Sequence, residues 1–70
     1  MKKMNIYINS TYREIPDNID TIGKLLPYLK ISKEGTGVGV NNKIALARNW
    51  DATSIKEDDR IVIISATYGG

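Results

Sequence analysis

Four consecutive β-branched residues, Ile61-Val62-Ile63-Ile64, limit the possible folds of this chain more than any other segment. β-Branched side chains favour an extended backbone and are stabilised by burial. An apolar run of this length without alternation predicts a strand in the middle of a sheet, buried on both faces. The other elements are therefore expected on either side of this final strand, with the first strand of the chain beside it.

The N-terminal segment predicts a β-hairpin. Residues 4–9 alternate between aliphatic and more polar side chains, which is typical of a strand with one apolar face. Asn9 and Ser10 follow as the turn, because asparagine tolerates positive φ. Residues 11–15 are then the return strand, and we expect Tyr12 and Ile15 to be its packing residues.

A helix is predicted after this hairpin. Asp20 or Thr21 can cap its N-terminus by accepting hydrogen bonds from free backbone amides. Pro27 costs about 3 kcal/mol inside a regular helix, so we expect a kink or a loosened turn there, with Gly23 easing the bend. The helix is indicated by one apolar stripe at helical spacing: Ile22, Leu25, Leu26 and Leu29.

A second hairpin is predicted in the C-terminal half. Residues 37–40 alternate between glycine and valine, Asn41 and Asn42 form a turn signal, and residues 44–47 return. Trp50 is expected to cover an open end of the core, and Ile55 to be buried. The order of elements therefore predicts an α+β fold with a mixed sheet of four to five strands and one helix packed on one face.

One helix covers only one face of such a sheet. Some of Val62, Ile64 and Ala66 should then point to the uncovered face. An exposed apolar patch on a small protein is often a docking surface. Ordinary partial exposure of strand residues is the alternative interpretation.

Composition excludes several kinds of site. The 70 residues, expected to form one domain (1–70), include no cysteine and no histidine, so disulfides, cysteine–zinc sites and the commonest general base are absent. We therefore expect no enzyme activity of the chain's own. Glu57, Asp58 and Asp59 lack the spaced oxygen ligands of a calcium loop, and a solvated turn is favoured.

The charge and hydropathy of the chain argue against nucleic acid and membrane partners. The formal net charge is +2, which is too balanced for a nucleic-acid surface. No apolar run is long enough to span a bilayer, and the N-terminus lacks the apolar core of a signal peptide. The expected compartment is the cytoplasm.

The last five residues differ in character from the apolar run. We expect residues 66–70 to form a flexible tail that ends on Gly69 and Gly70 with a free carboxylate. Five extended residues past Ser65 reach about 15 Å, and glycines without a Cβ fit a narrow slot in another protein. A frayed end without a role is the alternative.

These features together resemble the ThiS family of sulfur carriers, which have the β-grasp, or ubiquitin-like, fold. The resemblance covers nearly the whole chain and ends on Gly69-Gly70. The chain departs from the family pattern at Asn41-Asn42 and Glu57-Asp58-Asp59, where a glycine is common, and at Ala47, where a proline is common. The matching motifs are Thr21-Ile22-x-x-Leu25-Leu26, Val38-x-Val40-Asn41-Asn42, Arg48-x-Trp50 and Asp59-x-Ile61.

The resemblance implies that the chemistry takes place at Gly70. A ThiF-like adenylyltransferase, using ATP and magnesium, would adenylate its carboxylate, and a relay from a cysteine desulfurase would supply sulfur. The resulting thiocarboxylate would donate sulfur to thiazole synthase in thiamine biosynthesis, and the chain itself would bind no cofactor and no metal. Gly69, Tyr68, Thr67 and Ala66 would enter the partner's slot.

The adenylyltransferase is expected to dock on the outer face of the sheet through Val62 and Ile64. Three other functions stay open on the sequence: a MoaD-like carrier subunit of molybdopterin synthase, a ubiquitin-like protein modifier, and a plain interaction domain with an idle tail. The first shares the activation chemistry of the thiamine carrier, whereas the second would end on a lysine of a target protein.

Overall fold

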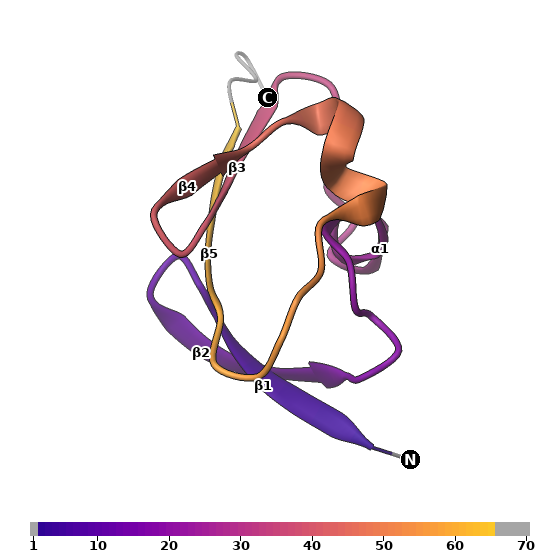
Figure 1. Ribbon diagram of the computed structural model, residues 1–70, viewed down its shortest axis with the longest axis vertical. Coiled ribbons are helices and arrows are strands. Elements are labelled where there is room, and N and C mark those ends of the chain that lie inside the picture. Colours follow the sequence, from indigo (N-terminus) through magenta and orange to yellow (C-terminus); the bar gives the residue numbers. More distant parts are fainter. Residues whose placement is uncertain (1, 66–70) are drawn as a thin grey trace.

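The computed structural model describes residues 2–65 (Figure 1). They form a single sheet of five strands, one α-helix and one 3₁₀ helix. The predicted tail, residues 66–70, lies outside the described residues. In chain order the elements are β1 (Lys3–Ile8), β2 (Thr11–Pro16), α1 (Ile22–Tyr28), β3 (Thr36–Val40), β4 (Lys43–Ala45), η1 (Ala47–Ala52) and β5 (Arg60–Ser65).

β5 is the central strand of the sheet. The strand order is β2-β1-β5-β3-β4, with β5 parallel to β1 and antiparallel to β3. Both α1 and η1 lie on the same side of this sheet (Figure 1). The predicted position of the final strand, beside the first, is confirmed, and so is the mixed sheet with a helix on one face.

The expectation that β5 is buried on both faces is wrong. Ile61 and Ile63 are buried against the helices, but Val62 and Ile64 are 48% and 65% exposed. The burial alternates because α1 and η1 cover only one face of the sheet, while the sequence of the strand is apolar throughout. The prediction that Val62 and Ile64 point to the uncovered face is therefore confirmed.

The core lies between the sheet and the two helices. Trp50 is 2% exposed, and its indole Nε1 donates a hydrogen bond to the carbonyl oxygen of Ala45 at 2.7 Å. The predictions of buried Trp50 and Ile55 are confirmed. The core cluster consists of apolar side chains from every element except β4: Met4, Ile6, Ile15, Ile22, Leu25, Leu26, Val38, Trp50, Ile55, Ile61 and Ile63.

Two asparagine-led turns close the predicted hairpins. Asn9 and Ser10 have φ values of 50° and 72°, and Asn41 and Asn42 have φ values of 51° and 69°. Two successive residues with positive φ form the turn type whose twist matches that of the flanking strands. Both predicted turns are confirmed, and they set the register of both hairpins.

The expectation that Tyr12 packs in the core with Ile15 is wrong. Ile15 is fully buried, whereas Tyr12 is 52% exposed. The two residues are three positions apart in a strand, so their side chains must point to opposite faces. Tyr12 instead packs against Tyr7, with 4.8 Å between the ring centroids, and its hydroxyl donates to Asp58 Oδ1 at 3.1 Å.

Helix α1 is short, and Pro27 lies in its last turn. Thr21 caps the N-terminus, because its Oγ1 accepts a hydrogen bond from the Lys24 amide at 3.2 Å. The helix ends at Tyr28, directly after the proline, and Lys30 takes a positive φ of 61°. Since Pro27 lies so near the helix end, it interrupts little of the hydrogen-bond ladder.

Gly23 permits a close approach between α1 and η1. A Cβ built on Gly23 would lie only 3.1 Å from Asp51 Cα, which is tighter than ordinary van der Waals contact. Gly23 therefore allows close helix packing, a role that differs from the predicted easing of a bend. The return strand predicted over residues 44–47 is also shorter than expected, because β4 ends at Ala45 and η1 begins at Ala47.

Candidate functional site

The point where β5 reaches Ser65 is the root of the predicted tail. On one side β5 pairs with β3, whose Thr36 and Gly37 are the register partners of Ser65 and Ile64. On the other side β1 ends at Ile8, whose register partner is Ile61, so β5 extends beyond β1 from Val62 onward.

The side chain of Asn9 replaces the missing strand on this side. Its Oδ1 accepts a hydrogen bond from the Ile63 amide at 2.8 Å, and its Nδ2 donates to the Ile63 carbonyl at 3.2 Å. The backbone amide of Asn9 also donates to the Ile61 carbonyl at 2.9 Å. Asn9 thus holds β5 in line up to two residues before Ser65.

Replacing Asn9 by alanine should loosen the end of β5. The change removes both side-chain hydrogen bonds at a partly buried site, which costs about 1–3 kcal/mol. It also replaces asparagine, which tolerates positive φ, by alanine, for which the same backbone conformation costs roughly 1 kcal/mol more. Urea unfolding should therefore show a loss of about 2–4 kcal/mol, and hydrogen exchange should show reduced protection of the Ile63 amide.

Asn9→Gly is the matched control, because glycine accepts the turn conformation but lacks the amide. It should lose less stability than Asn9→Ala and show the same loss of protection at Ile63. Full protection of the Ile63 amide in Asn9→Gly would show that the side chain does not hold this strand.

The outer face of the sheet, opposite α1 and η1, carries an apolar patch that we define as Ile44, Val62 and Ile64. Ile44 is 85% exposed. The register places Gly39 opposite both Val62 and Ile44, and Gly37 opposite Ile64, so all five residues share one face. The two glycines leave a hollow of about 310 Å³ beside the patch.

Ile44 was not among the predicted docking residues. The Asn41-Asn42 turn pairs Val40 with Lys43 and therefore Gly39 with Ile44. Counting outward from that turn is the sequence signal that could have found it. Its exposure was not apparent from the sequence, because an isoleucine in a short strand is equally compatible with the core.

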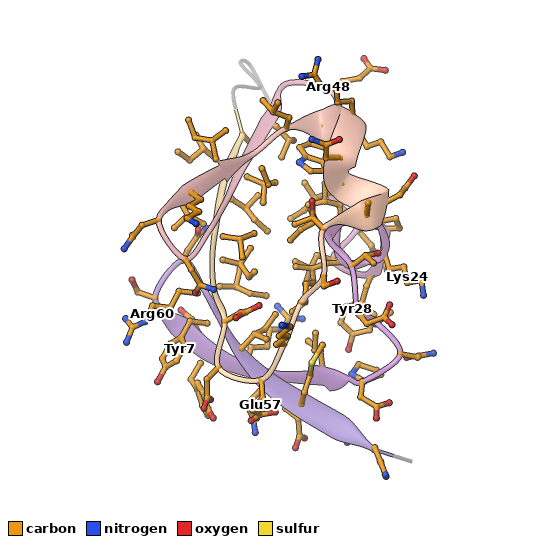
Figure 2. The ribbon with its side chains drawn as sticks, viewed as in Figure 1. Tyr7, Lys24, Tyr28, Arg48, Glu57 and Arg60 are labelled. Carbon is orange, nitrogen blue, oxygen red and sulfur yellow. The ribbon has the colours of Figure 1, made fainter. Side chains whose placement is uncertain are left out.

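An aromatic and charged border adjoins the apolar patch. The guanidinium carbon of Arg60 lies 4.9 Å from the centroid of the Tyr7 ring. Figure 2 shows Tyr7 and Arg60 beside one another on the side of the sheet away from Lys24 and Tyr28 of α1. Desolvation, followed by the hydrogen bond to Asp58, raises the pKa of Tyr12 above its usual value.

The carboxylates of Glu57 and Asp59, in the acidic turn before β5, accept hydrogen bonds that stabilise the fold. Glu57 Oε1 accepts from the Asn5 amide at 3.0 Å, and Asp59 Oδ2 accepts from the Lys56 amide at 2.8 Å. Asp59 Oδ1 accepts from Asn41 Nδ2 at 3.0 Å, which ties this turn to the second hairpin. Within residues 2–65, no group of three or more acidic side chains is placed to hold a metal ion.

The remaining predicted site residues lie beyond Ser65. Ala66, Thr67, Tyr68, Gly69 and Gly70 are outside the described residues, so the structure locates the strand that leads to them and not the residues themselves. Among residues 2–65, no helix is long and apolar enough to cross a membrane.

The fold defines the class of protein. A mixed five-stranded sheet with its C-terminal strand in the centre and one α-helix across one face is the β-grasp architecture, and a glycine pair follows the central strand in the sequence. A family model described as the ThiS family matches residues 6–70. The chain belongs to the ThiS family of small sulfur carrier proteins.

Two solved structures agree with this assignment. A crystal structure of a thiamine biosynthesis protein (ThiS) from Geobacter metallireducens has a TM-score of 0.81 and 25% identity, and the match covers 96% of this chain and 100% of that one. An NMR solution structure of a thiamine biosynthesis protein from the same organism has a TM-score of 0.72 and 26% identity, over 96% of this chain and 88% of that one. A comparison with curated protein sequences gave no significant match.

Proposed function

We propose that this chain carries sulfur for thiamine biosynthesis as a thiocarboxylate on Gly70. The observation that carries the proposal is the ThiS family match, which extends through Gly69 and Gly70. The central position of β5 supports it, because the strand that precedes these residues is held by neighbours on both sides. The domain then serves as a rigid base for a reactive end.

The chemistry requires activation of a poor electrophile. A ThiF-like adenylyltransferase would transfer AMP from ATP, with magnesium, to the Gly70 carboxylate and release pyrophosphate. A persulfide supplied by a cysteine desulfurase relay would then attack the acyl carbon and displace AMP. Reduction of the sulfur–sulfur bond by a thiol would leave the thiocarboxylate, which donates its sulfur to thiazole synthase.

In this scheme the chain is a co-substrate, and the catalytic groups belong to its partners. The chain has neither cysteine nor histidine to act as nucleophile or base. ATP and magnesium would be bound by the adenylyltransferase, and all steps would take place in the cytosol. Gly69 would give the end a narrow cross-section, while Ala66, Thr67 and Tyr68 would span the partner's slot.

We further propose that the adenylyltransferase docks on the outer face of the sheet through Val62 and Ile64. Both residues precede Ser65 in β5 and expose apolar surface that no element within residues 2–65 covers. A docked enzyme would therefore lie beside the root of the tail whose end it must reach.

Reconstitution with purified partners tests the pathway. The thiocarboxylated chain should lose its sulfur to thiazole synthase in the presence of that enzyme's other substrates and should not do so with the large subunit of molybdopterin synthase. The opposite preference would assign the chain to molybdopterin biosynthesis. An isopeptide bond between Gly70 and a lysine of another protein would instead identify a modifier.

A further inference from the structure

Two glycines in the interior of β3 lack an explanation within the fold. Glycine weakens a strand, because it has no side chain to pack and loses much backbone freedom. Gly37 and Gly39 do not have the positive φ that Gly35 has. A Cβ on Gly37 would lie 4.0 Å from the Ile64 carbonyl oxygen, and one on Gly39 would lie 3.5 Å from the Lys43 carbonyl oxygen, both ordinary contacts. The fold would therefore accept alanine at either position.

Both glycines form the floor of the hollow on the outer face. Val38 between them is buried on the core side, so Gly37 and Gly39 face outward. Ile44 forms one wall of the hollow, and Val62 and Ile64 form the other. None of these side chains contains nitrogen or oxygen, so the walls offer no side-chain hydrogen bond to orient a polar small molecule.

We propose that this hollow receives a bulky apolar side chain of the adenylyltransferase, whose atoms contact the β3 backbone where a Cβ would exclude them. A glycine in a strand interior often marks such a close approach. An apolar anchor in a well-packed pocket is also the usual centre of binding energy in a protein interface. The inference rests on the proposed function and adds to it the contact that selects the partner.

The position of the hollow favours this occupant. Gly37 is the register partner of Ile64, the residue immediately before Ser65. The five residues after Ser65 span about 15 Å when extended, so an enzyme that acts on Gly70 must place its surface within that distance of the end of β5. The hollow begins beside that end of β5. It lies on the face of the sheet opposite α1 and η1, and Figure 1 shows that both helices are on the other face.

Alanine substitutions at the two glycines separate binding from folding. Gly39→Ala and Gly37→Ala should leave the thermal midpoint unchanged or raise it by about 2–8 °C, because alanine favours the folded strand more than glycine does. Titration calorimetry with the adenylyltransferase should show affinity reduced at least about tenfold for Gly39→Ala, since the added methyl fills the floor of the hollow. The KM for adenylation should rise by the same factor, with kcat unchanged.

Glu14→Ala is the matched control, because Glu14 lies on the same face but on the far edge strand β2. It should bind the adenylyltransferase like the unmodified chain. If Gly39→Ala does not fold, Gly37→Ala decides the matter, since its Cβ has more space. Failure of both to fold would overturn the inference, because it assumes that the fold accepts a Cβ there.

Wild-type affinity in both glycine variants would also overturn the inference. So would a dimer of the unmodified chain that Gly39→Ala dissociates in sedimentation, since a second copy would then occupy the hollow. If the unmodified chain binds the adenylyltransferase but is never adenylated, the proposed function fails, and the affinity comparison still decides the role of the hollow.

Discussion

Removing Gly70 should abolish thiocarboxylate formation and leave the stability of the domain unchanged. The chain without Gly70 ends on Gly69, and its terminal carboxylate then falls one residue, about 3.5 Å, short of the adenylylating site. The core residues of the described part lie between Met4 and Ile63. The free energy of unfolding should therefore be the same as for the full chain, while mass spectrometry should detect no sulfur-containing product.

Gly70→Ala is the matched control for this deletion. It keeps the length of the chain and its terminal carboxylate but adds one methyl group to the Cα, which is bonded to the reacting carboxyl carbon. Misplacement of a reacting group by about 1 Å can cost on the order of 100-fold in rate, so we expect slow but measurable adenylation. A deletion variant that still accumulated thiocarboxylate at the rate of the full chain would contradict the assignment of Gly70.

Trp50→Ala should have the largest effect on folding. Truncating a buried tryptophan typically costs about 3–5 kcal/mol, and a domain of this size is stable by roughly 4–10 kcal/mol in total. The change would also leave the Ala45 carbonyl without the indole donor that lies 2.7 Å away. Urea unfolding followed by circular dichroism should show loss of most of the stability.

Trp50→Phe separates the packing of the ring from its hydrogen bond. Phenylalanine fills much of the same space but has no N–H, so the expected loss is smaller, about 1–3 kcal/mol. If Trp50→Ala lost less than about 1 kcal/mol, the side chain would not be the core element that its burial indicates.

The elements that the sequence predicted best depend on local chemistry. The pairs Asn9-Ser10 and Asn41-Asn42 signal turns because asparagine tolerates positive φ, and both turns adopt it. The capping threonine and the stripe at Ile22, Leu25 and Leu26 likewise depend only on near neighbours. The most apolar strand was correctly expected at the centre of the sheet, although the central position buries only one of its faces.

The elements that it predicted less well depend on what packs on each face. The apolar run of β5, taken alone, predicts burial on both faces, and that expectation was wrong because burial depends on which face α1 and η1 cover. Helix η1 also has no clear periodic pattern, and it forms where Trp50 enters the core.

The candidate site was predicted in part. The exposure of Val62 and Ile64 could be predicted because one helix covers only one of the two faces of the sheet. The exposure of Ile44 and the hollow with Gly37 and Gly39 at its floor could not, because both depend on the register between β3, β4 and β5. The anchoring of Ile63 by Asn9 could not be predicted, because the turn role of this asparagine already explained its presence in the sequence.

The most direct test of the sulfur-carrier function is intact-protein mass spectrometry after incubation of the chain with its adenylyltransferase, ATP, magnesium and a persulfide donor. The account predicts a mass increase equal to the replacement of one oxygen by sulfur, confined to the C-terminal peptide that contains Gly70 and dependent on ATP. An unchanged mass in the presence of active partners, or sulfur attached elsewhere in the chain, would contradict it.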